Sequence, residues 1–167
     1  MTCDAIIIGA GISGLYQLLK LRQLGMTARV FEAGTGVGGT WYWNRYPGAK
    51  FDSESYIYQY LFDEKLYKDW SWSERFPGQP EIERWLNYVA DRLDLKKDIQ
   101  FETTVKSAHF DEAAQRWQVT LHLNNNSGDT INPVVDCMFT NGGQVVENTR
   151  ASLPPVSGGQ RVGFVVY

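Results

Sequence analysis

The stretch DAIIIGAGISGL, residues 4–15, decides the fold of this chain. Residues 4–8 are an apolar run short enough for a buried strand, and a glycine-rich turn, Gly9–Gly14, follows at once. Residues 15–24 are typical of a helix, and residues 28–31 read as a second strand that ends at Glu32. This order of strand, glycine turn, helix, strand and acid predicts a βαβ unit that holds a dinucleotide.

Each glycine of the turn has a separate physical role. Gly9 allows the chain to turn sharply, Gly11 lets a pyrophosphate approach the backbone, and Gly14 lets the helix lie close to the strand. The free N–H groups and the dipole at the start of the helix favour a phosphate there. The plainer alternative is a glycine-rich turn with no ligand.

Glu32 indicates which dinucleotide fits. A carboxylate at the end of the second strand accepts hydrogen bonds from ribose hydroxyls and repels a 2′-phosphate. The residues alone therefore favour NAD or FAD over NADP.

Composition narrows the class of protein. The chain has 167 residues, 43% of them hydrophobic, and a net charge of −3, so it has enough apolar residues for a core and no basic surface for nucleic acid or an anionic membrane. No run approaches the roughly 20 apolar residues of a membrane span. The first residues lack the pattern of a signal peptide, so we expect none.

Cysteines and histidines predict no catalytic or metal site. Cys3 and Cys137 have no metal-type spacing, and we expect Cys137 to be a small buried apolar residue in a reduced, cytoplasmic setting. His109 and His122 fall in predicted strands and read as exposed positions.

The middle of the chain is rich in aromatic residues. Residues 33–40 contain four glycines and read as a loop, and the aromatic residues 41–48 continue it, either facing a flat ring or covering the core. Residues 63–70 suggest a short helix. Pro80 begins a clear helix whose apolar stripe consists of Ile82, Trp85, Leu86, Val89 and Leu93.

From residue 99 onward, apolar residues recur at every second position instead of every third or fourth. This pattern predicts strands over 99–103, 105–110, 117–123 and 130–135, the last as a third antiparallel strand. Residues 134–139 lead into Thr140–Gly142, residues 145–159 read as a loop, and residues 161–167 read as one more strand. We therefore predict an α/β fold, a Rossmann-like parallel βαβ sheet with helices and a small antiparallel meander. It forms a single domain over 1–167, with a core at 3–144 and a divergent tail at 145–167.

A more specific signal lies in GGTWYWNRYPGA, residues 38–49, followed by Asp52, Glu54 and Ser55. Together with WSWSER at 70–75 and QPEI at 79–82, it resembles the N-terminal FAD-binding part of the flavin-dependent Baeyer–Villiger monooxygenases, the cyclohexanone and phenylacetone monooxygenase type. The resemblance runs from about Asp4 to Gly143.

The resemblance implies FAD as the cofactor and assigns residues to it by position. The turn glycines and Ser13 would hold the pyrophosphate, and Glu32 would hold the adenosine ribose. Asp52 and Tyr58 would lie near the isoalloxazine, and the backbone of Val105 would read the adenine edge. The full set implied is Gly9, Gly11, Ser13, Gly14, Glu32, Gly39, Thr40, Trp41, Asp52, Tyr58, Val105 and Gly142.

The sequence departs from the family near its end. The strand at 161–167 does not lead into the family's second GxGxxG, which binds NADPH, and residues 145–157 stand where the family has its fingerprint between the two motifs. We therefore expect a region truncated before the NADPH domain, with little or no monooxygenase activity of its own.

Three functions are compatible with these observations. The first is a minimal FAD-binding flavoprotein with unspecific redox activity, in which external donors reduce the flavin and O2 reoxidises it to H2O2. The second is the FAD-binding half of a monooxygenase that works with a separate chain. The third is a fold in which the glycines are only structural. In each case uncovered sheet edges predict self-association or a partner chain.

Overall fold

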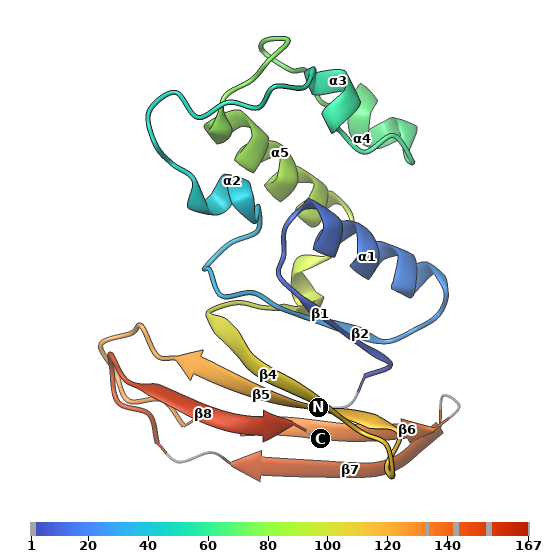
Figure 1. Ribbon diagram of the computed structural model, residues 1–167, viewed down its shortest axis with the longest axis vertical. Coiled ribbons are helices and arrows are strands. Elements are labelled where there is room, and N and C mark those ends of the chain that lie inside the picture. Colours follow the sequence, from blue (N-terminus) through green and yellow to red (C-terminus); the bar gives the residue numbers. More distant parts are fainter. Residues whose placement is uncertain (1–2, 133, 142–143, 153–154, 167) are drawn as a thin grey trace.

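The computed structural model describes residues 3–132, 134–141, 144–152 and 155–166; over 134–152 and most of 161–166 it describes the course of the backbone (Figure 1). The elements follow one another as β1 (Ala5–Ile8), α1 (Ile12–Gln23), β2 (Ala28–Phe31), α2 (Thr40–Trp43), α3 (Ser55–Tyr58), α4 (Glu64–Lys68), α5 (Gln79–Arg92), a 3-10 turn η1 (Lys96–Asp98), β3 (Ile99–Gln100), β4 (Thr103–Asp111), β5 (Arg116–Asn124), β6 (Val134–Asn141), β7 (Gln144–Ser152) and β8 (Arg161–Val166).

A parallel sheet in the order β1–β2–β3 forms the middle layer. Its register places Ile7 beside Val30 and Val30 beside Ile99. The crossover from β1 to β2 is helix α1, as the apolar run and glycine turn predict. Among the described strands β1 pairs only with β2, so its other edge carries no strand.

Helices cover one face of this sheet. Ile7 and Val30 point into a core that they share with Leu18 of α1 and with Trp85 and Leu86 of α5. Ile82, Trp85, Leu86 and Val89 are all buried, which confirms the stripe predicted for this helix, and Leu93 packs partly buried beside them. The spacing of three and four residues places them on one side of α5.

An antiparallel sheet in the order β4–β5–β8 covers the other face. Phe31 of the parallel sheet packs there against Val119 and Leu121 of β5, with Ile6 and Val105 at the margin. The molecule thus has a layer of helices, a parallel sheet and an antiparallel sheet, and Figure 1 shows the parallel strands between the other two. The predicted α/β class with a small antiparallel part is confirmed.

The strand expected over 99–103 is divided. Ile99 and Gln100 pair with β2, whereas Thr103 begins β4 in the other sheet. Glu102 lies between them with a φ of 53°, a left-handed conformation that turns the chain out of one sheet and into the next. A period of two does not reveal such a change of sheet.

The prediction of a third antiparallel strand at 130–135 is wrong, because β8 pairs with β5 instead. A buried amide explains the choice. Asn125 donates from Nδ2 to the carbonyl oxygens of Asp129 and Val156, each at 2.8 Å, and its backbone N–H donates to the Gln160 carbonyl. These bonds hold residues 156–160 against the end of β5, so the strand that follows pairs there.

The loop expected over 145–159 is also wrong in part. Residues 144–152 form β7, which pairs antiparallel with β6, while Ile131 makes only an isolated bridge with Val156. The β6 strand runs through Thr140 to Asn141, which pairs with Gln144 of β7.

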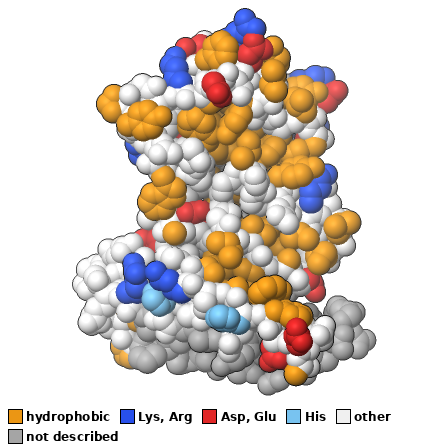
Figure 2. All heavy atoms as spheres, viewed as in Figure 1, with side chains coloured by type: hydrophobic (Ala, Val, Ile, Leu, Met, Phe, Trp, Pro, Cys, Tyr) orange, Lys and Arg blue, Asp and Glu red, His pale blue; other side chains and the backbone are white. Residues whose placement is uncertain are grey.

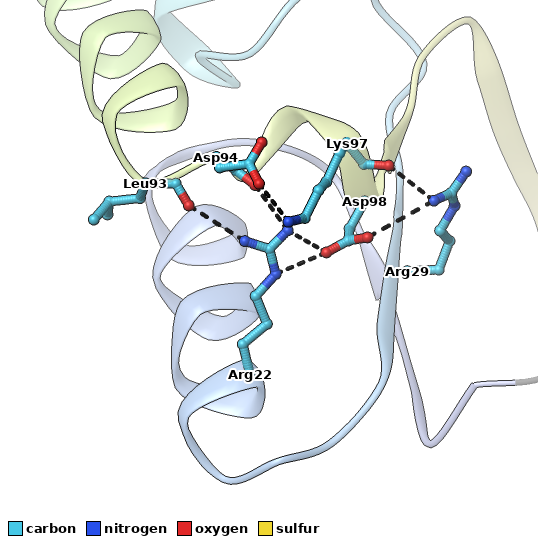
Figure 3. Close-up of polar contacts among 6 residues, drawn as sticks. All are labelled: Arg22, Arg29, Leu93, Asp94, Lys97 and Asp98. Carbon is cyan, nitrogen blue, oxygen red and sulfur yellow. Dashed lines mark hydrogen bonds and ion pairs between the residues drawn. The ribbon is translucent and has the colours of Figure 1, made fainter.

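An arginine clamp holds the ends of α1, α5 and η1 together (Figure 3). Arg22 donates to Asp98 from Nε at 2.7 Å and also from a terminal nitrogen, and it donates to the carbonyl oxygens of Leu93 and Asp94 at 3.3 and 2.8 Å. Arg29 of β2 donates to the Lys97 carbonyl at 3.0 Å. The Arg22 guanidinium thereby satisfies the carbonyls of Leu93 and Asp94, which are left free where α5 ends.

We expect Asp98→Ala to lower the free energy of unfolding by about 1–2 kcal/mol, because a partly buried charge-assisted hydrogen bond is lost. Urea denaturation followed by circular dichroism measures it. Asp91→Ala is the matched control, since Asp91 pairs with Lys96 at the surface and such pairs contribute about 0–1 kcal/mol. Equal effects of the two variants would contradict the clamp.

Candidate functional site

The first glycine turn has the geometry that its sequence predicts. Gly9 has a φ of +94°, which permits the sharp turn after β1. A Cβ on Gly14 would lie 2.1 Å from the Gly9 carbonyl oxygen, so only glycine lets α1 pack this closely. Among the described residues no side chain caps the first turn of α1, and its N–H groups stay available for a negative group.

A second glycine turn, Gly36–Gly39, lies directly against the first. The Gly38 N–H donates to the Ala10 carbonyl at 3.0 Å. A Cβ on Gly39 would lie 2.8 Å from the Cα of Gly11, and Gly39 itself has a φ of +55°. The two turns therefore meet backbone to backbone. Gly39 is the residue that this contact requires to be glycine, because its Cβ would overlap the backbone of Gly11.

Glu32 joins the first glycine turn, and the Gly34 backbone just before the second turn, to the end of β2. Its side chain is only 4% exposed, and its two carboxylate oxygens accept the N–H groups of Ala10 and Gly34, each at 2.7 Å. Each oxygen keeps a further lone pair, so the carboxylate can still accept a hydroxyl. Sequence reasoning assigned Glu32 to a ribose and missed this structural role.

We expect Glu32→Gln to destabilise the fold by about 1–3 kcal/mol, since the amide NH2 would face one of the two backbone N–H groups and leave it unsatisfied. The free energy of unfolding in urea measures this. Glu112→Gln, at an exposed position after β4, is the control, and two variants of equal stability would contradict the role given to Glu32.

Aromatic residues follow the second glycine turn. The stretch expected to be a loop begins with the one-turn helix α2, so that expectation is wrong for Thr40–Trp43. Trp41 is buried, and its Nε1 donates to the Tyr58 hydroxyl at 2.9 Å. Phe51 stacks on Tyr58 with ring centroids 4.4 Å apart. The structure thus brings Trp41 and Tyr58 together.

The remaining predicted residues are more scattered. Ser13, Thr40 and Asp52 are exposed. Val105 lies half-buried on β4, whose first residue, Thr103, donates its N–H to the Glu32 carbonyl at 2.9 Å. Gly142 lies outside the described residues, as does the side chain of Cys137.

Two tyrosines near the glycine turns escaped the sequence reasoning. The Tyr42 ring fills the space beside Gly34 and Gly36, and its hydroxyl accepts the Thr35 N–H at 3.0 Å. The Tyr60 hydroxyl donates to the Ile12 carbonyl at the start of α1, and burial raises the pKa of Tyr60. The only signal in the sequence was the nearness of glycines and aromatic residues.

The histidines stand apart from this site. His109 is exposed as expected, but the expectation is wrong for His122, which is half-buried. Strand β8, predicted as a strand but not as a partner of β5, covers it, and Gly163 leaves the space that its imidazole fills. Within the described residues no three His, Cys, Asp or Glu side chains gather as metal ligands, and no helix is long and apolar enough to span a bilayer.

These features fit a dinucleotide. Two glycine turns leave backbone N–H groups clear of side chains, a buried carboxylate stands at the end of β2, and all lie at the carboxyl ends of the parallel strands. Ligands of open α/β sheets bind at this edge.

Comparison with known proteins agrees with this geometry. The family model described as an NAD(P)-binding Rossmann-like domain matches residues 7–70. The chain is 64% identical over 130 residues to acetone monooxygenase (methyl acetate-forming) of Gordonia sp., covering 78% of this chain and 24% of that protein. It is 46% identical over 129 residues to a Baeyer–Villiger monooxygenase of Pseudooceanicola batsensis, covering 77% and 23%.

Solved structures give the same relationship. OTEMO in complex with FAD and NADP has a TM-score of 0.69 and 47% identity, over 72% of this chain and 23% of that one. Oxidised steroid monooxygenase bound to NADP has a TM-score of 0.71 and 51% identity, over 72% and 23%. The chain spans about a quarter of the length of these relatives.

Proposed function

Because about three quarters of this chain are homologous to the FAD-binding N-terminal region of Baeyer–Villiger monooxygenases, we propose that the chain itself binds FAD along its two adjoining glycine turns. The observation that carries the proposal is the backbone contact of Gly11 with Gly39 beside the buried carboxylate of Glu32. The comparisons confirm the predicted relationship to FAD-dependent monooxygenases, and the homologous OTEMO was solved with FAD.

Each proposed binding residue has a chemical role. The turn residues Gly9, Gly11, Ser13 and Gly14 and the uncapped N–H groups of α1 would hold the pyrophosphate, and Glu32 would accept the ribose hydroxyls. Gly39, Thr40 and Trp41 would lie along the ribityl chain, Asp52 and Tyr58 near the ring, and the Val105 backbone at the adenine. Gly142 remains a proposal from sequence alone.

The bound flavin would supply electron-transfer chemistry, and the protein would bind and orient it. We propose that this chain alone has at most unspecific redox activity, reduction by external donors and reoxidation by O2 to H2O2. In support, the carboxylate beside the glycine turns, that of Glu32, is already engaged by two backbone N–H groups.

As a second candidate function, the chain would be the FAD-binding part of a monooxygenase and would work with another chain. That other chain would be a different protein or a second copy of this one. The edge of β1 with which no described strand pairs supports this candidate, and Ile8 of this strand is 65% exposed. Figure 2 shows apolar side chains gathered over the helical half of one face; exposed residues of these helices and their connections include Tyr56, Ile57 and Leu61. Such edges and patches are typical of interfaces.

A cytoplasmic location is proposed from the two isolated cysteines.

The visible absorption spectrum of the purified protein tests FAD binding, measured before and after denaturation, with chromatography of what is released. We expect the two flavin bands and FAD at about one per chain. A colourless protein that also takes up no added FAD would contradict the proposal and leave the glycines as fold elements.

Sedimentation at high concentration tests self-association, and a clean monomer would contradict the homodimer.

A further inference from the structure

A single glutamine on α5 holds the short helix that carries the second glycine turn. Gln79 is 6% exposed, and its Nε2 donates to the Trp41 carbonyl in α2 and, at 2.8 Å, to Oε2 of Glu83. Its own backbone N–H donates to the Ala49 carbonyl at 2.8 Å. The side chain therefore has a fixed position from which to bind α2.

Helix α2 needs such help because it has only four residues. A helix this short is far below the length that is stable in water, and its last carbonyls have no partners within the helix. Asn44 donates its N–H to the Thr40 carbonyl at 2.9 Å, which leaves the carbonyls of Trp41 and Tyr42 to find partners elsewhere.

Helix α5 supplies both partners from one face. The Gln79 side-chain amide donates directly to the Trp41 carbonyl. Glu83, four residues later, forms an ion pair with Arg45, with 2.5 Å between Oε1 and a terminal guanidinium nitrogen. Arg45 in turn donates from Nε to the Tyr42 carbonyl at 2.8 Å. Residues four apart lie on the same side of a helix, so one face of α5 terminates α2 at two points.

We propose that Gln79 is a positioning residue for FAD: by fixing the Trp41 carbonyl it orders α2 in advance and so sets Gly39 against Gly11 and Trp41 against Tyr58. This inference rests on the proposed function, because it assigns Gln79 a role in the same site. A binding segment that is ordered beforehand loses less conformational freedom when the ligand binds. The role proposed for Gln79 acts through its bond to α2.

The test compares Gln79→Met with the wild-type chain and with Gln23→Met as a matched control. The first change removes the amide donor and keeps the length of the side chain, and the second makes the same change at an exposed position at the end of α1. Two quantities are measured on each protein: amide hydrogen exchange at residues 41–44 without FAD, and the dissociation constant for FAD.

For Gln79→Met we expect exchange at residues 41–44 to become about tenfold faster while the amides of α1 keep their rates, and the dissociation constant for FAD to rise about tenfold. Gln23→Met should match the wild type in both. Unchanged exchange at 41–44, or equal acceleration throughout the protein, would overturn the proposal, since Gln79 would then have no local role or only a general stabilising one.

The two readouts separate this inference from the proposed function. Faster exchange at 41–44 with unchanged FAD affinity would overturn the cofactor role of Gln79 and leave FAD binding intact. A wild-type chain that binds no FAD would overturn the proposed function and the cofactor role together, and the exchange rates would then decide whether Gln79 orders α2.

Discussion

Gly11→Val is expected to raise the dissociation constant for FAD by about 100-fold or more, equivalent to about 2.7 kcal/mol, while far-UV circular dichroism stays unchanged. The Cβ of any residue here lies 3.4 Å from the Cα of Gly39, which is ordinary contact, but the branching methyl groups of valine extend beyond it. They would push the two glycine turns apart and occupy the path proposed for the pyrophosphate.

Gly11→Ala is the graded control for this prediction. Its single methyl group meets Gly39 without overlap, so we expect a loss of affinity within about tenfold, or about 1.4 kcal/mol. Titration with FAD, followed by the quenching of flavin fluorescence, measures both variants. Wild-type affinity in Gly11→Val would contradict the placement of the phosphates at this turn.

Gly14→Ala is expected to lower the free energy of unfolding by about 3 kcal/mol. Glycine to alanine inside a helix normally stabilises a protein by up to about 1 kcal/mol, so the expected sign is reversed. The reason is the Cβ position 2.1 Å from the Gly9 carbonyl oxygen, where backbone and not a flexible side chain must move. The start of α1 would have to lift from β1.

Gly128→Ala provides the comparison, because nothing lies within 4 Å of its Cβ position. It should change the free energy of unfolding by less than about 0.5 kcal/mol. Thermal and urea denaturation of the two variants measure the difference. If Gly14→Ala proved as stable as the wild type, α1 would not pack on β1 as closely as described.

The parts of the fold that follow from local pattern could be predicted from the sequence. Gly9 and Gly14 define a turn whose geometry depends on a few adjacent residues, and the stripe of α5 depends only on helical spacing. The hairpin of β4 and β5 follows from a period of two on both sides of a polar turn. In each case the deciding residues lie close together in the chain.

The rest depends on contacts between distant residues. Local pattern does not indicate helix α2, because a partner of its Trp41 carbonyl is Gln79, 38 positions further along the chain. The pairing of β8 with β5 was missed because Asn125 brings residues 156–160 into place. For the site, the motif and the resemblance identified the glycines and Glu32, but the contact of Gly11 with Gly39 appears only in three dimensions.

The change of sheet at Glu102 has a consequence for how the molecule unfolds. Residues 99–111 contribute to the parallel sheet at one end and to the antiparallel sheet at the other, and Thr103 and Glu102 donate their N–H groups to the carbonyls of Glu32 and Gly34 at the junction. Neither sheet can lose this segment without disturbing its neighbour. We expect the β1–β2–β3 and β4–β5–β8 sheets to melt in one cooperative transition.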